Sequence, residues 1–329
     1  MKRLVGILTV LMLAVSVFAV DFSAGIKLGG DLLAYDGDNF KVISVGNQTG
    51  QWDMPMNFSV STEKAGGSFK IWPGQCMGEF KLWFKPLEGV TVSAGEVGMS
   101  LNQEQIDWWR SNAKGEGWGY SVAYDNSGFS FGAEVLVGDG FLFESKKVVE
   151  EGKDPEVFWA PMYFQLGYDF KAALDKDFGR IAGFFKLNKK EDMNFGLGYN
   201  NTLFGSTYMF LNAIMNMSTK LDSMRFELYV APVIEFVGIK IWVPVDYNLN
   251  ADDNALGIGS VIRADLNLGA PVTPYLRVES DNFLADTFGM IIKPGITGSV
   301  GAMGYDVGIA FNVGEKFTFS VPVSYTLGF

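Results

Sequence analysis

The sequence predicts an all-β fold, a closed antiparallel transmembrane β-barrel of about 16 to 18 strands. Three observations predict it. Apolar and polar residues alternate with a period of two along most of the chain, the composition is apolar without a membrane-length apolar run, and the first residues have the layout of an export signal. Successive side chains of a strand point to opposite sides, so each alternating segment has one apolar face and one polar face.

The clearest segment is the last one, from Lys316 to Phe329. It is longer than the roughly 9 to 11 residues that a tilted strand needs to cross a bilayer. One face carries Phe317, Phe319, Val321, Val323, Tyr325, Leu327 and Phe329, and the other carries Thr318, Ser320, Pro322, Ser324, Thr326 and Gly328. An apolar face with aromatic residues at both ends is typical of a transmembrane barrel strand.

An alternating last strand that ends on Phe329 resembles the assembly signature of outer-membrane β-barrel proteins, whose final aromatic residue is read by the insertion machinery. This resemblance implies an outer-membrane location, contact with membrane lipid, and the barrel assembly machinery as a partner of the C-terminal strand. Taken alone, the same stretch also fits an edge strand of a soluble β-sandwich, because alternation marks any half-buried strand.

Residues 1–19 have the layout of a secretory signal peptide. Lys2 and Arg3 precede an apolar run that ends in a small-residue cleavage site at Ala19. We therefore expect residues 20–329 to form one barrel domain. Cys76 is the single cysteine and lies far from that junction, so neither an intrachain disulfide nor a lipid-modified N-terminus is expected.

The charge and hydropathy exclude several classes of protein. The chain has 26 Lys and Arg against 37 Asp and Glu, and an acidic surface of this kind argues against nucleic acid as a partner. Mean hydropathy is +0.14. Beyond the signal, the best candidate for a membrane helix, 229–245, contains Glu235 and Lys240, so a helical membrane protein is excluded. A closed barrel is the remaining way to satisfy every backbone group in lipid.

The first half of the chain alternates in segments separated by polar loops. We predict strands at 21–35, 52–61, 68–72, 78–86, 90–97, 118–124 and 129–137, of which 68–72 and 78–86 are the weakest. The predicted loops are 36–50, 98–116 and 138–157, and Asp125-Asn126-Ser127-Gly128 is a tight turn.

The second half repeats the pattern with shorter connections. We predict strands at 158–170, 178–188, 193–200, 206–217, 224–236, 239–247, 256–268, 272–280, 287–302 and 305–313 before the closing strand. The apolar register of 287–302 continues across Pro294, which predicts a single kinked strand. Loops at 248–255 and 281–286 fall on the same side as the three long loops above, whereas turns at Asn126, Gly238, Gly269 and Gly304 fall on the other side. A barrel with both ends in the periplasm sorts its connections in this way.

The loop at 98–116 is a candidate pore constriction. By strand count it is the third external loop, and in order and length it resembles the third loop of general porins, which folds into the lumen. Its charged residues would be Glu104, Asp107 and Arg110. The alternative is an ordinary external loop whose tryptophans lie at the membrane interface or in a subunit contact.

Charged residues on the polar side of the strands predict a wet interior, because Lys or Arg at mid-membrane costs about 2–4 kcal/mol on the lipid face. The expected lumen-facing charges are Lys27, Asp31, Arg180, Lys186, Arg225, Glu227, Arg263 and Asp265; Lys81, Lys85, Glu134, Glu235, Lys240, Asp246 and Lys293 share this side. Such charges tune ion selectivity or brace the wall in pairs.

Nothing in the sequence marks an enzyme. The chain has no histidine, which disfavours Ser/His and Asp/His hydrolases and, with one cysteine, zinc sites. No phosphate-binding loop or dinucleotide fingerprint occurs. No cofactor is expected; clustered loop carboxylates at Asp36 and Asp38 and at Asp252 and Asp253 offer a weak calcium candidate, with solvated loop charge as the alternative.

The sequence therefore predicts an outer-membrane porin, a water-filled channel for passive diffusion of small hydrophilic solutes and ions. The chain resembles porins of this size, which are homotrimers, and this resemblance implies a homo-oligomer. The alternative is a structural surface or sheath barrel packed in arrays, with the channel incidental. A substrate-selective channel with an aromatic ladder, and a soluble secreted binding sandwich, are further alternatives.

Overall fold

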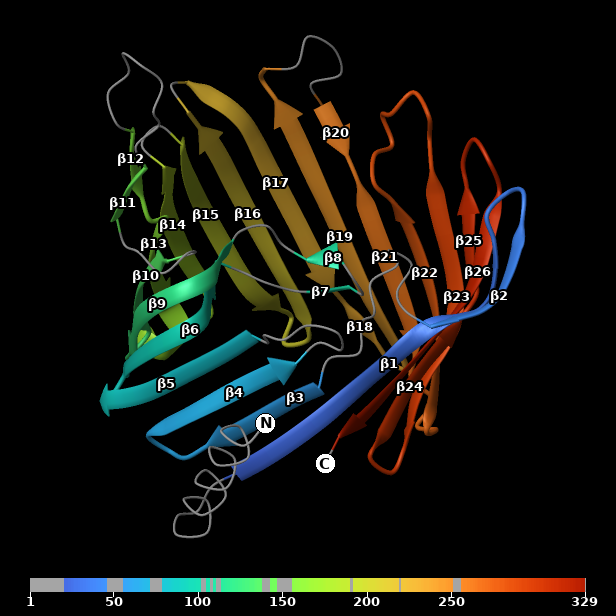
Figure 1. The fold of residues 1–329 in the computed structure, drawn as a ribbon, viewed down its shortest axis with the longest axis horizontal. Helices are drawn as coiled ribbons and strands as arrows, with labels where there is room; N and C mark the ends of the chain where they lie inside the picture. The colour runs from blue at the N-terminus through green and yellow to red at the C-terminus, as the bar shows by residue number, and fades with distance from the viewer. Residues whose placement is uncertain are drawn as a thin grey trace.

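The chain forms a closed antiparallel β-barrel (Figure 1). The computed structural model describes residues 21–328 apart from 46–55, 72–78, 102–104, 107–108, 111–113, 138–142, 147–155, 190–191, 219 and 251–255. Figure 1 shows β14 to β23 as one long wall, with β1, β3, β4 and β5 crossing in front of it. Within the described residues, no helix has the length and apolar character to cross a membrane.

The first half of the barrel includes the two longest strands of the described chain, which have 15 and 13 residues. Its strands are β1 (Asp21–Tyr35), β2 (Phe40–Val45), β3 (Met56–Ser61), β4 (Ala65–Ile71), β5 (Glu79–Leu87), β6 (Val90–Ser100), β7 (Gln105–Ile106), β8 (Trp109–Arg110), β9 (Lys114–Asn126), β10 (Phe129–Leu136), β11 (Phe143–Lys146), β12 (Glu156–Trp159) and β13 (Met162–Asp169). The short helix α2 (Phe170–Leu174) follows, with Asp169 accepting a hydrogen bond from the Ala172 amide as its N-cap.

The second half contains the remaining strands. They are β14 (Arg180–Lys189), β15 (Asp192–Leu203), β16 (Thr207–Met217), β17 (Leu221–Ala231), β18 (Val233–Ile234), β19 (Val237–Asn248), β20 (Leu256–Ile258), β21 (Ser260–Leu266), β22 (Val272–Ser280), β23 (Met290–Val300), β24 (Met303–Gly308), β25 (Ala310–Val313) and β26 (Thr318–Gly328). The weak predicted segments 68–72 and 78–86 are both strands, β4 and β5.

The main sheet contains 22 strand segments, and four barrel positions are each made of two. β2 and β3 both pair with β1, β17 and β18 both pair with β19, β20 and β21 also pair with β19, and β24 and β25 both pair with β23 and β26. The barrel therefore has 18 strands, which confirms the upper value of the predicted range.

The barrel closes between its first and last strands. β1 pairs with β26 in antiparallel register from Gly25 opposite Gly328 to Tyr35 opposite Phe319. The described chain thus begins and finishes at the same end of the barrel, here called the turn end; the opposite end is the loop end. This placement agrees with the predicted even strand number.

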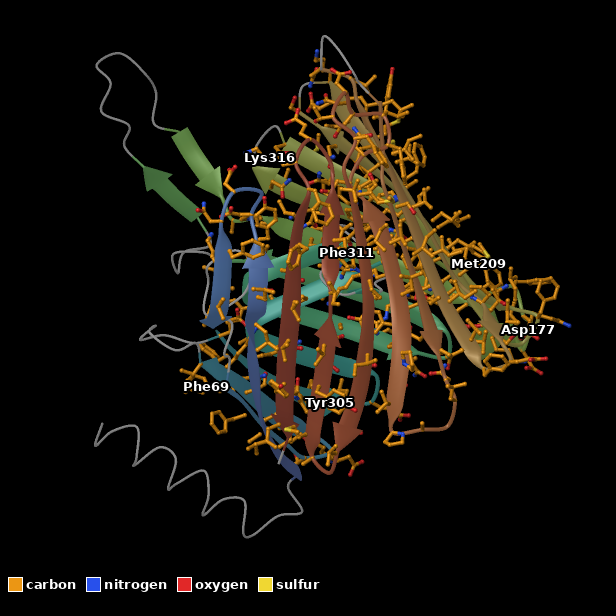
Figure 2. All side chains as sticks on the ribbon, turned by 90° about the vertical axis from the view of Figure 1, so that its right-hand side faces the viewer. Phe69, Asp177, Met209, Tyr305, Phe311 and Lys316 are labelled. Atoms are coloured by element: carbon orange, nitrogen blue, oxygen red, sulfur yellow. The ribbon has the colours of Figure 1, made fainter. Side chains whose placement is uncertain are left out.

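The connections alternate between the two ends as predicted, with local differences. The predicted loop 36–50 contains β2, which pairs with the second half of β1. The predicted loop 138–157 contains the β11–β12 hairpin, a separate two-stranded sheet that projects beyond the wall (Figure 2). At the turn end, β13 and β14 are joined by α2 rather than by a tight turn.

Two predicted turn positions are wrong by a few residues. The reversal assigned to Gly238 lies at Glu235 and Phe236, and Gly238 pairs opposite Val233 within β19. The left-handed backbone there belongs to Glu235, with φ 49°, so no glycine marks it. Likewise the turn assigned to Gly304 lies at Gly301, with φ 59°, and Gly304 pairs opposite Ser299 in β24.

β23 remains one strand across Pro294, as predicted, because the irregularity is in its partner. β24 pairs with it up to Gly295 opposite Gly308, and β25 resumes from Ile292 opposite Phe311. Ile309 lies between these two segments and donates its amide to the Pro294 carbonyl at 2.9 Å. A residue without an amide hydrogen is thus accommodated next to a break in the ladder.

The two faces of the wall differ in chemistry. Large apolar side chains stand on the outer face with about half of their surface exposed; examples on successive strands are Leu82, Val122, Phe131, Leu166, Ile181, Leu197, Leu211, Phe226, Ile262, Leu276 and Ile296. Charged, amide and hydroxyl side chains occupy the inner face, together with two apolar clusters. One cluster contains Leu101, Tyr163, Ala182, Phe184 and Ile214, and the other contains Phe210, Tyr229, Trp242 and Val261.

The turn between β9 and β10 yields a stability prediction. Gly128 and Gly205 have similar left-handed backbones, with φ 83° and 73°, but a Cβ on Gly128 would meet the Asp169 carbonyl oxygen at 2.6 Å, whereas one on Gly205 would meet nothing within 4 Å. Both alanine variants lose about 1 kcal/mol to backbone strain, and we expect Gly128→Ala to lose about 1–3 kcal/mol more from overpacking. Urea unfolding in lipid vesicles measures the difference, and equal losses for the two variants would contradict the described turn.

Candidate functional site

The candidate site is the inner face of the barrel, which the strand register defines residue by residue. From β16 to β19, for example, Asn212 lies opposite Glu227 and Glu227 opposite Pro244, while the intervening Ala213, Phe226 and Val245 form the outer row. Because side chains alternate, every second residue of each strand faces inward. The inner face therefore collects polar groups from strands that are far apart in the sequence.

Four cations lie directly opposite one another on the inner face of neighbouring strands. The register pairs Lys240 with Arg263, Arg263 with Arg277, and Arg277 with Lys293, across β19, β21, β22 and β23. Like charges in directly opposed positions repel one another. The row therefore requires compensating anions close by.

Carboxylates beside this row supply the compensation. Arg263 bonds Asp265 at 2.9 Å, Arg277 bonds Glu279 at 3.0 Å, and Lys293 lies 3.5 Å from Asp306. The Tyr275 hydroxyl donates to Asp306 at 2.9 Å, and the Arg263 guanidinium lies 4.1 Å from the centre of the Tyr275 ring. The cations of β21 to β23 thus belong to a network of ion pairs and hydrogen bonds that connects β21, β22, β23 and β24.

A second network joins β16, β17 and β19. Glu227 is 1% exposed; its carboxylate accepts from the Arg225 Nε at 2.9 Å and from the Asn212 amide at 3.0 Å. The Arg225 Nη1 also donates to both carboxylate oxygens of Asp246, at 2.9 and 3.1 Å. A buried carboxylate is tolerated only when it is paired and hydrogen-bonded, and this arrangement meets both conditions.

Several inward aromatic rings lie against glycines of the neighbouring strand. Trp83 is opposite Gly66, Phe184 opposite Gly196, and Tyr275 opposite Gly295. A Cβ placed on Gly66 would come within 2.6 Å of the Trp83 ring, and one placed on Gly196 or Gly295 would come closer still to the facing ring. The missing side chain lets each ring lie along the wall, so a large residue takes little of the interior.

The chain leaving β6 turns onto the inner wall. Leu101 is 3% exposed in a cluster with Tyr163, Phe184 and Ile214 of three later strands, and its carbonyl accepts from the Arg180 guanidinium at 3.3 Å. Figure 1 shows the small β7–β8 hairpin between the walls. The loop predicted at 98–116 thus starts inside the barrel.

Of the residues proposed for a constriction, Glu104 and Asp107 lie outside the described residues, and Arg110 is placed only as part of the β8 backbone. The charged side chains of this loop therefore lie outside the described part of the chain. Its anchor at Leu101 and Arg180 is the part that the structure describes.

The structure places the predicted lumen charges as follows. Most of the predicted residues lie on the inner face, namely Arg180, Lys186, Arg225, Glu227, Arg263 and Asp265. Arg180 also donates a hydrogen bond to the Ser130 hydroxyl at 3.1 Å. Asp31 occupies an inner position of β1 opposite Pro322, and the backbone of Lys27 is in register with Thr326. One residue of the wider set does not belong there, because Glu235 lies in the β18–β19 turn.

The inward aromatic residues were not predicted. Phe184, Phe210 and Trp242 stand at positions where the alternation requires a polar residue, within the runs Phe184-Phe185, Met209-Phe210-Leu211 and Ile241-Trp242-Val243. Apolar residues on both faces of a strand are the signal that could have identified them, since one of the two faces must then pack inside.

The loop-end carboxylates proposed as a calcium candidate are engaged by lysines. Asp36 bonds Lys41 at 3.2 Å and Asp38 bonds Lys316 at 3.0 Å, so Lys316 joins the β25–β26 loop to the β1–β2 hairpin (Figure 2). Amide donation from Asn39 and Asp38 lowers the pKa of Asp36 to about 2, aided by Lys41. Asp252 and Asp253 are outside the described residues, among which no three potential ligands gather for a metal ion.

The fold is similar to that of solved outer-membrane proteins. No protein-family model and no curated protein matches the sequence. Among solved structures, Pseudomonas aeruginosa OpdQ aligns with a TM-score of 0.61 at 9% identity, covering 95% of this chain and 99% of that one. The Pseudomonas aeruginosa outer membrane protein opdK gives 0.59 at 10% identity, covering 94% and 98%, and Acinetobacter baumannii OccAB4 gives 0.59 at 9%, also covering 94% and 98%. At this identity the likeness concerns the fold.

The Arg225 network yields a prediction. Arg225→Met removes the guanidinium beside the buried Glu227 carboxylate, and breaking a buried pair in this way typically costs about 3–5 kcal/mol. We expect a loss of stability of this order, and partial recovery in the double variant Arg225→Met/Glu227→Gln, in which no buried charge is left. Lys171→Met, which breaks a fully exposed pair on α2, serves as the control and should leave unfolding unchanged. Wild-type stability for Arg225→Met would show that the pair contributes nothing.

Proposed function

We propose that this protein is an outer-membrane porin, a water-filled channel through which small hydrophilic solutes and ions diffuse passively. The observation that carries the proposal is the combination of a closed 18-strand barrel with an apolar outer face and a charged, hydrogen-bonding inner face. Barrels of about 16 to 18 strands are wide enough to hold water, whereas those of about 8 strands are filled by their own side chains. The inner ion pairs need such a polar interior.

The likeness to outer-membrane proteins along nearly the whole chain supports the location in the outer membrane. We assign residues 1–19 as the export signal and Phe329 as the residue read during membrane insertion, both from the sequence. A homotrimer is part of the same proposal. The chain carries no histidine for general acid–base work, so we assign it no catalytic activity.

The segment after β6 is proposed to narrow the channel. Leu101 and Arg180 fix its start on the inner wall, beside β13 to β16. From there the chain must return to β9, whose Lys114 pairs with Ser100 at the loop end. The charged residues Glu104, Asp107 and Arg110 fall between these two fixed points and are our candidates for the constriction.

The channel is tested by electrical recording. Purified protein inserted into a planar lipid bilayer should give stepwise currents that rise linearly with voltage, because an open aqueous pore behaves as a resistor. A denatured or detergent-only sample is the control. A correctly folded barrel, verified by heat-modifiable gel mobility, that passes no current would instead identify a structural surface barrel.

The constriction is tested at its anchor. Leu101→Asp places a charge into the cluster of Tyr163, Phe184 and Ile214, which should release the segment from the wall and raise the single-channel conductance by roughly twofold. Leu284→Asp, in an exposed connection at the same end, is the matched control and should conduct as the wild type. An unchanged conductance in Leu101→Asp would remove the segment from the conducting path.

A further inference from the structure

We propose that the solute path is eccentric, running along the inner face of β1, β3, β4, β5 and β6, and that a hollow there binds uncharged solutes bearing several hydroxyl groups. This inference rests on the proposed channel function. It assigns one side of the interior to transport and the opposite side to structure.

The first argument is the unequal exposure of the inner wall. On β16 to β21, inward Phe210, Trp242 and Val261 are 0% exposed, and on β22 the inward Arg277 and Glu279 are 4% and 3% exposed. On β1, β3 and β4, by contrast, inward Ser23, Asn57 and Ser68 are exposed. Water therefore reaches the inner wall of β1, β3 and β4; on the other side it reaches the exposed Asp246 of β19 but not Phe210, Trp242 or Val261. A diffusing solute must follow the water.

The second argument is the shape of that region. A hollow of about 680 Å³ lies over β1, β3, β4, β5 and β6. Its inward lining includes Ser23, Asn57, Ser59, Ser68, Lys70 and Glu79. Small-molecule sites typically measure about 300–1,000 Å³, so the hollow is of a suitable size for a small solute.

The third argument is chemical. Hydroxyl and amide groups on three adjacent strands form the floor, and the cross-strand pair Ser23 and Ser59 is hydrogen-bonded. The charges at the side form a pair, with Lys70 3.1 Å from Glu79. Lys81 and Glu96, which also line the hollow, carry opposite charges. A neutral surface that offers both donors and acceptors fits a neutral solute that offers the same.

This surface is less suited to charged solutes. The inner cations of β21 to β23 are each engaged by a carboxylate, and two of them, Arg277 and Lys293, are at most 8% exposed. They contribute little field to the hollow, because each is engaged by a carboxylate within about 4 Å and the remainder is screened by water and salt. We therefore infer hydroxyl recognition without strong charge selection.

The path is tested by cysteine modification in a Cys76→Ser background. Ser68→Cys and Ser59→Cys place thiols on the exposed inner wall, and Val261→Cys places one on the covered inner wall of β21. A bulky methanethiosulfonate reagent should lower single-channel conductance at least about twofold in the two serine variants and leave Val261→Cys unchanged. Reduction of the mixed disulfide should restore the current. Equal block at all three positions, or block at Val261→Cys alone, would overturn the eccentric path.

The solute class is tested in proteoliposomes with glucose and gluconate, which are similar in size and hydroxyl content but differ by one carboxylate. Glucose should enter several-fold faster, and labelling of Ser68→Cys should remove its uptake. Faster gluconate entry would overturn the assignment. A wild-type protein that conducts no ions would defeat the channel function itself, whereas a conducting wild type with insensitive serine variants would defeat this inference alone.

Discussion

Closure of the sheet between β1 and β26 is the constraint on which the rest of the structure depends. In hydrocarbon an unpaired backbone amide or carbonyl has no water to bond, so an open sheet edge is not tolerated. The pairing from Gly25 opposite Gly328 to Tyr35 opposite Phe319 leaves β1 and β26 with no free edge along this seam. Once closed, the barrel has two separate faces, and each residue's position in the alternation decides which solvent it meets.

The inner face shows how a wide barrel keeps its shape around water. Ion pairs link neighbouring strands to each other, as in Arg225 with Asp246 and Lys293 with Asp306. Each pair also removes net charge from the interior. The result is a polar wall whose strands are linked by hydrogen bonds and ion pairs.

The period-two pattern was sufficient to predict the barrel, a range of strand numbers that includes the observed one, and the inner position of pairs such as Arg263 and Asp265, because residues two apart in a strand share a face whatever their neighbours are. It could not predict which residues meet across strands. The row from Lys240 to Lys293 depends on the stagger of four strands, which follows from turn lengths and barrel shear. The inward rings Phe184 and Trp242 were also missed, since alternation assigns a large apolar residue to the outside. The turn at Glu235 was not predicted, because Glu235 adopts a left-handed backbone conformation that glycine normally occupies.

The rings that lie over glycines have a consequence for assembly. Tyr275 can lie flat only opposite Gly295, because its neighbours two places away on β23 are Lys293 and Thr297, whose side chains would occupy the same space. Trp83 opposite Gly66 has Ser68 two places along β4. A strand that slips by two residues keeps the same residues facing inward but loses the fit between ring and glycine. Each ring and its glycine thus favour one register between two strands that follow one another in the chain.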